Sequence, residues 1–249
     1  AGDSEEELYG AAVDALATLH ALPAPSALPC GDDGPLHHVP PYDDPALLTE
    51  VALLPAWYVR LATGSEASTQ VQAQFNTAWA DILPHARGAA DVLVLRDYHS
   101  PNLLLLDERT GVARVGIIDF QDSLIGPAAY DVVSLLQDAR RTVPAPIEAR
   151  LLARYESART TQNSGFDADQ FRAAYAIMGA QRNTKIIGIF ARLLLCDGKP
   201  QYLAHIPRLA DYLARDLEHP TLAPLAQWFE ANVPLAQMRV EIDPGTVTS

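Results

Sequence analysis

The sequence has few cysteines and no long hydrophobic run. Cys30 and Cys196 lie far apart and neither belongs to a CxxC pair, which favours a reduced, cytoplasmic protein over a disulfide scaffold. The longest apolar stretch, residues 186–196, is too short to cross a bilayer and contains Arg192. The acidic start of the chain lacks the basic and apolar parts of a secretory signal. We therefore expect no membrane partner.

Basic residues are also scarce. Lys and Arg together number 18, against 31 Asp and Glu, which gives a formal net charge of -13 at pH 7. A field of this sign repels nucleic acid and anionic membrane surfaces, so neither is expected as a partner. It does not forbid a local basic pocket for a phosphorylated ligand. The 249 residues, of which 49% are hydrophobic, suffice for one large domain or two small ones with a sizeable core.

The hydrophobic pattern predicts a mainly helical chain with a small sheet. Helices are predicted at 5–22, 45–62, 66–83, 129–141, 147–159, 168–196, 203–217 and 222–231. Short apolar runs bounded by turn residues predict strands at 92–95, 103–106 and 112–118. The segment 23–35 and the tail after Pro234 are predicted to be irregular.

The last two predicted strands should bring polar residues together. The turn at 107–111 joins them into a hairpin. With that turn centred near Arg109, Asn102 lies opposite residues 116–119, so its carboxamide meets the carboxylate of Asp119. Asp97 lies five residues before Asn102, on the loop that leads in from the first strand. Three polar groups therefore converge where strands end, which is where sites tend to be built.

These three side chains suit a site for magnesium and a nucleotide. Mg²⁺ prefers oxygen ligands and needs only one or two from the protein, which Asn102 and Asp119 can supply. Asp97 is then free to accept the proton of an attacking hydroxyl, a role worth roughly 10²–10⁴-fold in rate. Taken singly, Asp97 and Asn102 are explained better as ordinary turn residues, because Asp and Asn favour loops. Their combination with Asp119 and the Tyr130-Asp131 pair downstream favours the catalytic interpretation.

The motifs resemble those of a known family. Residues 97–102 (DYHSPN) have the Asp-to-Asn spacing of the catalytic loop in protein kinases and aminoglycoside/choline phosphotransferases. Residues 118–120 (IDF) resemble the metal-binding segment of that family, and residues 126–131 (GPAAYD) resemble the element that follows it. One departure is Leu95, where most relatives have a histidine.

The resemblance implies roles for these residues and a fold. Asp97 becomes the catalytic base, Asn102 and Asp119 become the magnesium ligands, and Asp131 becomes a structural anchor of the loop. The implied fold is α+β and protein-kinase-like, with a mainly helical C-terminal lobe and a small β-hairpin catalytic segment. The chain is then a single lobe, 1–249. We divide it into a helical entry segment (1–90), a catalytic loop and hairpin (91–131), and a helical substrate-side subdomain (132–249).

The resemblance also implies an N-terminal nucleotide lobe. That lobe would carry a Gly-rich phosphate loop, a strand lysine and a helical glutamate. Nothing before Asp91 matches this pattern, and the single Gly64 in ATGSEAS is no such loop. The chain is therefore expected to begin at the lobe boundary. Either the nucleotide lobe precedes Ala1 in the protein, or the protein is a degenerate relative.

A closer resemblance narrows the expected activity. Residues 118–140 and 178–203 look like those of bacterial anomeric sugar kinases, which phosphorylate the C1 hydroxyl of N-acetylmuramate and N-acetylglucosamine in peptidoglycan recycling. This resemblance implies ATP as co-substrate, Mg²⁺ as cofactor and an amino sugar as the small-molecule partner. Two alternatives stay open: an aminoglycoside or choline-type phosphotransferase, and a non-catalytic, pseudokinase-like binding module. The sequence does not indicate an oligomeric state.

Further candidate substrate contacts lie on the longest predicted helix. At 100° per residue, Gln181, Lys185, Gly188 and Arg192 share one sector, with Arg182 at its flank. This cationic stripe is either salt-bridged to some of the many acids or forms a pocket wall that binds hydroxyls or a carboxylate. The second alternative makes Arg182 and Lys185 contacts for the lactyl carboxylate of N-acetylmuramate. A cationic aminoglycoside would prefer acidic walls.

Two residues near the catalytic motifs are weaker candidates. His99 lies inside the loop and either contacts substrate or stabilises the loop. Asp122 either supports the residues that hold the metal, contacts substrate, or is a solvated loop carboxylate.

Overall fold

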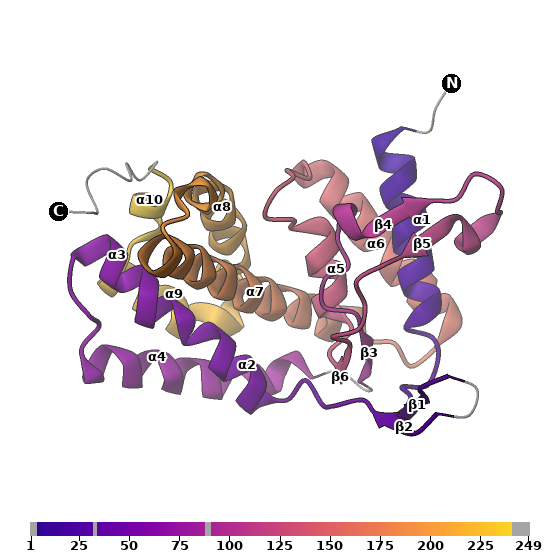
Figure 1. Ribbon diagram of the computed structural model, residues 1–249, viewed down its shortest axis with the longest axis horizontal. Helices are drawn as coiled ribbons and strands as arrows, with labels where there is room; N and C mark the ends of the chain where they lie inside the picture. Colours follow the sequence, from indigo (N-terminus) through magenta and orange to yellow (C-terminus); the bar gives the residue numbers. More distant parts are fainter. Residues whose placement is uncertain (1–3, 32–33, 88–90, 241–249) are drawn as a thin grey trace. The chain divides into compact units, whose positions relative to one another are not determined.

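The computed structural model describes residues 4–31, 34–87 and 91–240. These residues form α-helices and short antiparallel strands (Figure 1). The α-helices are α1 Glu5–Leu19, α2 Asp44–Val51, α3 Val59–Thr63, α4 Thr69–Ile82, α5 Ala129–Leu136, α6 Ala145–Gln162, α7 Ala168–Asp197, α8 Ile206–Asp216, α9 Ala223–Asn232 and α10 Leu235–Met238. The strands are β1 Ala27–Pro29, β2 Leu36–His38, β3 Val92–Val94, β4 Leu103–Leu105, β5 Val115–Ile117 and β6 Leu124–Gly126.

The strands pair in twos. β4 and β5 form the predicted hairpin, with Leu103 opposite Ile117 and Leu105 opposite Val115. β3 pairs instead with β6, a strand that the sequence pattern did not predict. β1 lies within the segment 23–35 that was expected to be irregular, and it pairs with β2 directly after that segment. Proline content hid this last pair, because Pro29 ends β1 and Pro35 directly precedes β2.

Several predicted helices are shorter or interrupted. The helix expected at 45–62 is split into α2, a π-helical turn Leu54–Tyr58 and α3. Pro55 lies in that turn, and because proline has no backbone N–H it cannot continue the α-helical hydrogen-bond ladder. The tail after Pro234 was expected to be irregular, but it contains the helical turn α10. Among the described residues, no helix combines the length and hydropathy needed to cross a membrane.

The described residues fall into two compact units. One is drawn from residues 1–42, 87–138 and 143–175, and we call it the catalytic-loop unit; the other, drawn from 43–86, 139–142 and 176–249, is the helical unit. The predicted division into three consecutive segments differs from this one. The reason is that helices far apart in sequence pack together, namely α1 with α6 and α4 with α9.

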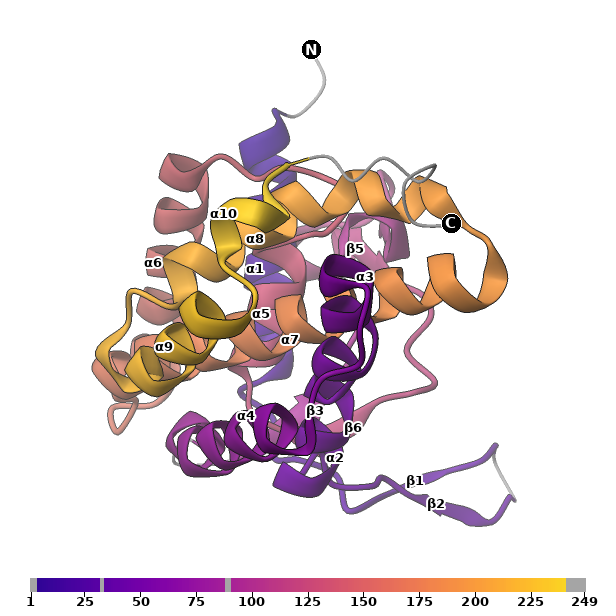
Figure 2. The same cartoon turned by 90° about the vertical axis from the view of Figure 1, so that its left-hand side faces the viewer.

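In the catalytic-loop unit, α1 runs beside α6 (Figure 1, Figure 2). Two arginines of α6 form bidentate ion pairs with acidic residues of α1. Arg150 donates two hydrogen bonds to Glu6 at 2.7 and 2.8 Å, and Arg154 donates two to Asp14 at 2.7 and 2.6 Å. The glycine at position 10 leaves space for the Arg154 side chain, because a Cβ there would lie 2.8 Å from the guanidinium. The β4–β5 hairpin packs against the same helix through β5 and the turn before it.

In the helical unit, α4 lies beside α9 (Figure 2). The contact is aromatic: the Phe75 and Trp228 rings lie 4.4 Å apart, and the Trp228 indole N–H donates to the Val71 carbonyl at 3.1 Å. A buried polar contact joins α7 to α8, where the Asn183 side chain donates to Asp216 at 3.2 Å. Burial of such a carboxylate requires partners of this kind.

Three buried tyrosines predict how stability responds to alkali. Burial raises the pKa of Tyr58 to about 12. Burial, with a smaller contribution from Asp131, raises the pKa of Tyr98 further. Burial likewise raises the pKa of Tyr155. A group whose pKa is higher in the folded state contributes stability that is complete below its unfolded pKa of about 10 and is lost as pH rises above it.

We therefore expect the free energy of unfolding to fall above pH 10. The slope is up to about 1.4 kcal/mol per pH unit for each tyrosine that stays protonated in the folded state. Lysines add little, because Lys185 and Lys199 are the only two in the sequence. Urea unfolding at pH 9, 10 and 11 measures the slope, and Tyr58→Phe should make it shallower. A constant free energy of unfolding across this range would contradict the prediction.

Candidate active site

The loop that follows β3 presents the Asp97 side chain to solvent. Its backbone is tightly folded: Asp97 N–H donates to the Leu95 carbonyl at 2.8 Å, and His99 N–H donates to the Asp97 carbonyl at 3.0 Å. A 3₁₀ turn, Ser100–Asn102, follows and leads directly into β4. The loop backbone is therefore fixed while the Asp97 carboxylate is exposed, which suits a group that meets a diffusing substrate.

The residue before Asp97 has an unusual backbone conformation. Arg96 has φ of 67°, in the left-handed region that residues other than glycine rarely occupy. The carboxylate of Asp131 holds this conformation, since it accepts hydrogen bonds from the backbone N–H groups of Leu95 at 2.7 Å and Arg96 at 2.8 Å. Asp131 is fully buried. Its implied role as the structural anchor of the loop is confirmed.

The hairpin brings Asn102 and Asp119 together as its register predicts. Ile118 N–H donates to the Asn102 carbonyl at 3.1 Å, one step beyond the last pair of the β4–β5 ladder. The side-chain amide of Asn102 donates to the Asp119 carboxylate at 3.4 Å and to the backbone carbonyl of Asp97 at 3.0 Å. One carboxamide therefore links the backbone of the predicted base to the predicted metal ligand.

Asp119 is itself in a left-handed conformation, with φ of 61°. Such conformations cluster at functional sites, where the surrounding structure holds them in place. Its second carboxylate oxygen accepts a hydrogen bond from the Gln121 side chain at 2.8 Å. The sequence reasoning missed Gln121. Its position two residues after Asp119, in the same loop, was the available signal.

The donor set fits Mg²⁺. Asp119 is exposed, and its two carboxylate oxygens offer more lone pairs than Asn102 and Gln121 occupy. Asn102 donates both hydrogen bonds from its N–H₂ group, so that group faces Asp119, and the carboxamide oxygen would reach an ion shared with Asp119 only after the amide turns over. Among the described residues, no group of three or more His, Cys, Asp or Glu side chains forms a metal site. Mg²⁺ usually keeps several waters and takes only one or two protein ligands.

The two weaker candidates differ in their surroundings. His99 is buried, and its backbone carbonyl accepts from Asn102 N–H at 2.9 Å. These features favour the loop-stabilising alternative for His99. Asp122 is exposed in the turn that follows Asp119 and is available to a ligand or to water.

The cationic stripe of α7 lies in the helical unit, whereas Asp97, Asn102 and Asp119 lie in the catalytic-loop unit. Within the helical unit the stripe faces α2. The Lys185 ammonium lies 2.7 Å from Glu50, which also accepts a hydrogen bond from Gln181 at 3.0 Å. Gly188 lies against the backbone of Leu53, where a Cβ would come within 2.5 Å of the Leu53 carbonyl carbon. These contacts favour the salt-bridged alternative for Lys185.

Arg182, the other candidate substrate contact, is buried with 5% of its surface exposed. A buried guanidinium requires hydrogen-bond or charge partners within the protein, so burial favours a structural role for Arg182.

Replacing Lys185 tests which role it has. The side chains of the pair are 15% and 16% exposed, so removing Lys185 leaves a mostly desolvated Glu50 carboxylate. We expect Lys185→Met to lower the free energy of unfolding by about 1–3 kcal/mol, and the added Glu50→Gln to restore part of it. Chemical unfolding of the single and double variants measures this. If Lys185 instead serves substrate binding alone, Lys185→Met would leave stability unchanged and raise only the KM for the substrate.

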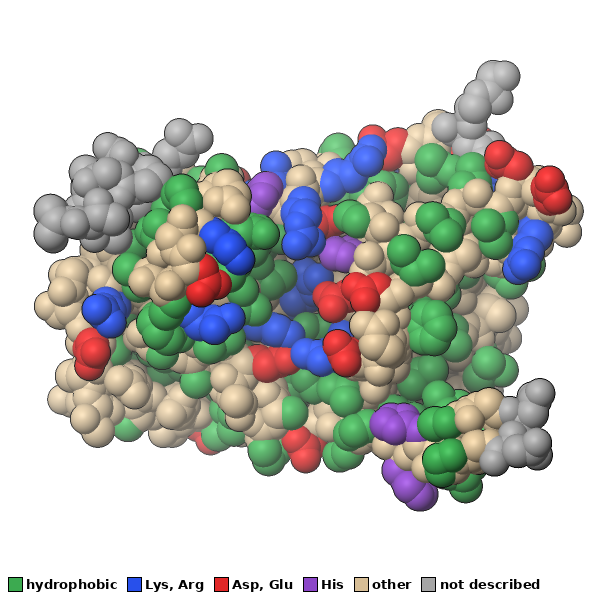
Figure 3. Space-filling model, in the orientation of Figure 1, with side chains coloured by type: hydrophobic (Ala, Val, Ile, Leu, Met, Phe, Trp, Pro, Cys, Tyr) green, Lys and Arg blue, Asp and Glu red, His purple; other side chains and the backbone are tan. Residues whose placement is uncertain are grey.

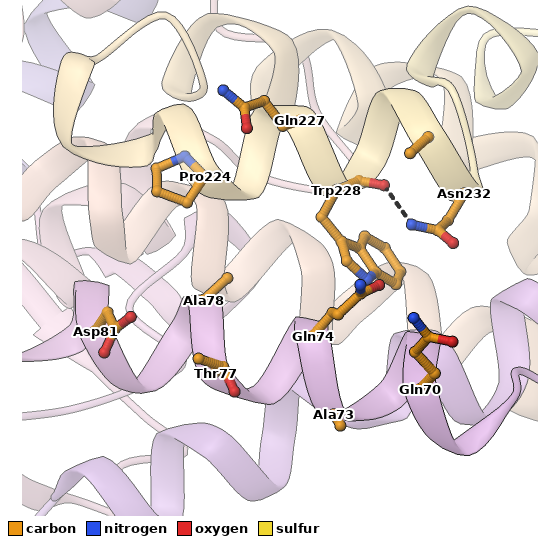
Figure 4. A pocket seen from close by; sticks show the side chains of 11 residues that line it. Gln70, Ala73, Gln74, Thr77, Ala78, Asp81, Pro224, Gln227, Trp228 and Asn232 are labelled. Atoms are coloured by element: carbon orange, nitrogen blue, oxygen red, sulfur yellow. Dashed lines mark hydrogen bonds between the residues drawn. The ribbon is translucent and has the colours of Figure 1, made fainter.

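A surface groove in the helical unit contains none of the predicted site residues. It lies between α4 and α9, has a volume of about 690 Å³ and is lined by neutral polar and apolar side chains in equal measure, with one carboxylate (Figure 4). Its polar lining consists of Gln70, Gln74, Thr77, Asp81, Gln227 and Asn232. Among the residues that the structure describes, Asp81 is its single carboxylate and no lysine or arginine lines it, so this lining does not fit a phosphate ligand.

Hydrophobic side chains gather over β4 and β5 in the space-filling view (Figure 3). Leu104, Leu105, Ile118 and Phe120 are each between 44% and 56% exposed. Exposed apolar surface of this kind marks an interaction or ligand site more often than an ordinary surface does. Here it adjoins Asn102 and Asp119.

Comparison with known proteins places the chain in a family. A model of the phosphotransferase enzyme family matches residues 2–172. The chain therefore belongs to this family. Its fold is also similar to that of a solved choline/ethanolamine kinase family protein from Mesorhizobium loti, with a TM-score of 0.51 over 93% of this chain and 65% of that chain. At 13% identity this similarity shows the fold alone, which confirms the predicted kinase-like architecture.

The similar curated proteins share one description. The chain is 42% identical, over 96% of its length, to the N-acetylmuramate/N-acetylglucosamine kinase of Caulobacter vibrioides, and 34% identical, over 90%, to that of Pseudomonas putida. A protein of the same description from Neisseria meningitidis is 38% identical over 75% of the chain. The chain spans 64%, 62% and 55% of the length of these three relatives.

Proposed function

We propose that the protein is an ATP-dependent kinase that phosphorylates an amino sugar at its C1 hydroxyl, with N-acetylmuramate and N-acetylglucosamine as acceptors. The observation that most supports this proposal is the pair of hydrogen bonds from the Asn102 side chain, which link the Asp97 backbone to the Asp119 carboxylate. This link supports the proposed roles, because Asp97 as proton acceptor and Asp119 as metal ligand would lie next to each other on a fixed backbone. The names of the relatives support the choice of acceptor.

In the proposed reaction, Asp97 accepts a hydrogen bond from the sugar hydroxyl and orients its oxygen toward the γ-phosphorus of ATP. A new bond forms between that oxygen and phosphorus while the bond from phosphorus to the leaving ADP oxygen breaks. The hydroxyl proton passes to Asp97 and then to solvent. In phosphoryl transfer the protein contributes mainly by positioning the reacting groups and by neutralising charge. Asn102 and Asp119 would hold Mg²⁺, which neutralises phosphate charge when it is bound.

An acceptor screen tests the proposal. The full-length protein is incubated with Mg–ATP labelled in its γ-phosphate, and with amino sugars, choline or aminoglycosides in parallel. We expect label to appear on N-acetylmuramate and N-acetylglucosamine, and a 1-O-methyl glycoside, which lacks the free C1 hydroxyl, to accept none. Transfer to choline or to an aminoglycoside instead would overturn the acceptor.

Calorimetric titration with Mg–ATP tests the alternative of a non-catalytic binding module. An active kinase binds the nucleotide in a magnesium-dependent manner. If the full-length protein shows no such binding, the pseudokinase-like alternative is supported and the kinase proposal fails.

A further inference from the structure

Three polar side chains lie buried behind the catalytic loop. His20 follows the last turn of α1, Asp131 lies in the first turn of α5 and Tyr155 lies on α6. Each is at most 2% exposed. The His20 Nδ1 atom lies 2.7 Å from the Tyr155 hydroxyl, and its Nε2 atom lies 3.6 Å from the Asp131 carboxylate. All three belong to the catalytic-loop unit.

The two contacts of the imidazole indicate which ring nitrogen accepts a hydrogen bond and which one faces Asp131. Because burial raises the pKa of Tyr155, its hydroxyl keeps its proton and is able to donate it to Nδ1 of His20. With that donation, the ring nitrogen that carries a proton toward Asp131 is Nε2, the nitrogen on the side that faces the carboxylate. Nε2 has no hydrogen-bond partner among the described residues, and at 3.6 Å its N–H meets Asp131 as an electrostatic contact. The same carboxylate holds the backbone of Leu95 and Arg96.

A second connection joins α1 to the other side of Asp97. The buried Tyr98 hydroxyl donates to the carbonyl of Ala12 in α1 at 2.8 Å. The two neighbours of the exposed Asp97 are therefore both connected to α1. Arg96 is connected through Asp131 and His20, and Tyr98 through its own hydroxyl. A left-handed residue such as Arg96 persists only where its surroundings hold it, so loss of either tie should release the loop.

We propose that His20 is a positioning residue for phosphoryl transfer: its imidazole, oriented by Tyr155, fixes the Asp131 carboxylate, which in turn fixes the backbone that aims Asp97. This inference rests on the proposed kinase function. His20 touches neither substrate nor metal in this scheme. Its contribution is to the geometry of the attacking step, so it should appear in kcat and not in substrate affinity.

Kinetics of His20→Leu and His20→Gln in the full-length protein test this inference. We expect His20→Leu to lower kcat roughly 10²-fold, because small misplacement of a catalytic group is that costly, and to leave both KM values within about twofold. His20→Gln should lie between His20→Leu and the wild type, because its amide N–H can replace the N–H that faces Asp131. His85→Leu, an exposed histidine of the helical unit, is the matched control and should leave kcat unchanged.

Backbone hydrogen exchange supplies a readout that does not need activity. In His20→Leu the amides of Leu95 and Arg96 should exchange roughly tenfold faster, while the amides of the β4–β5 ladder keep their rates. If His20→Leu folds and its kcat and these two exchange rates match the wild type, the inference is wrong. Equal losses in all amides would also overturn it, because they show general destabilisation. The two proposals can fail separately. If the wild type phosphorylates no acceptor but the two amides exchange faster in His20→Leu, the kinase function is wrong, whereas the link from His20 to the loop backbone stands.

Discussion

Replacing Asp97 with asparagine is expected to lower kcat for phosphate transfer roughly 10²–10⁴-fold while the protein still binds Mg–ATP. Asparagine keeps the shape of the side chain but does not accept the proton of the sugar hydroxyl. The loop should persist, because its hydrogen bonds use the backbone of residue 97: the carbonyl accepts from Asn102 and His99, and the N–H donates to Leu95. The loss should therefore fall on the chemical step, with both KM values little changed.

Steady-state kinetics of the full-length protein with N-acetylmuramate measure this loss, and calorimetry measures Mg–ATP affinity in the same variant. Asp107→Asn is the matched control, because the Asp107 carboxylate lies in the hairpin turn, is 82% exposed, and its contact with Arg114 is long, at 3.8 Å. Its kcat should equal that of the wild type. Unchanged turnover in Asp97→Asn would remove the assigned role of Asp97, whatever the acceptor.

The meeting of Asn102 and Asp119 could be predicted because it depends only on local information. A turn at 107–111 fixes the register of the two strands that flank it, and the register fixes which residues are opposite each other. The observed pairs, with Leu103 opposite Ile117, follow from that turn. Similarly, the start of α1 depends on a local signal, because the Ser4 side chain accepts from Glu7 N–H three residues later, as a capping residue does.

Contacts between distant segments could not be predicted in this way. β3 pairs with β6, and Tyr42 N–H donates to the Ile125 carbonyl at 2.7 Å, across more than 80 residues of chain. No turn specifies such pairings; they depend on how the helices pack. The same limit hid the role of His20, which lies 111 positions before Asp131 and reads in the sequence as an ordinary helix-end residue.

The cationic stripe of α7 shows a different limit. Helical periodicity correctly placed Gln181, Lys185 and Gly188 on one face, since all three contact α2 or the turn that follows it. Periodicity identifies a face but not what covers it. A lysine that faces a substrate and a lysine that faces Glu50 produce the same pattern, and only the fold distinguishes them.

Replacing Asp119 with asparagine should be as damaging as the loss of Asp97, but in a way that depends on magnesium. The substitution removes one negative charge from the proposed metal site, and such charge stabilisation is worth several kcal/mol in a transition state, or roughly 10³-fold in rate. Asparagine is the right probe because residue 119 has φ of 61°, a conformation that asparagine tolerates better than most residues. The hairpin should therefore keep its shape.

Titration of activity with Mg²⁺ separates the two losses. We expect Asp119→Asn to need more Mg²⁺ for half-maximal activity and to recover part of its kcat as the concentration rises, since a weakened site still fills by mass action. Asp97→Asn should keep the wild-type magnesium requirement and gain nothing. Asp122→Asn is the control: it removes an exposed carboxylate three residues away and should leave the magnesium requirement unchanged. If Asp119→Asn and Asp122→Asn respond alike, the site attracts Mg²⁺ through general negative charge, and Asp119 is not a ligand.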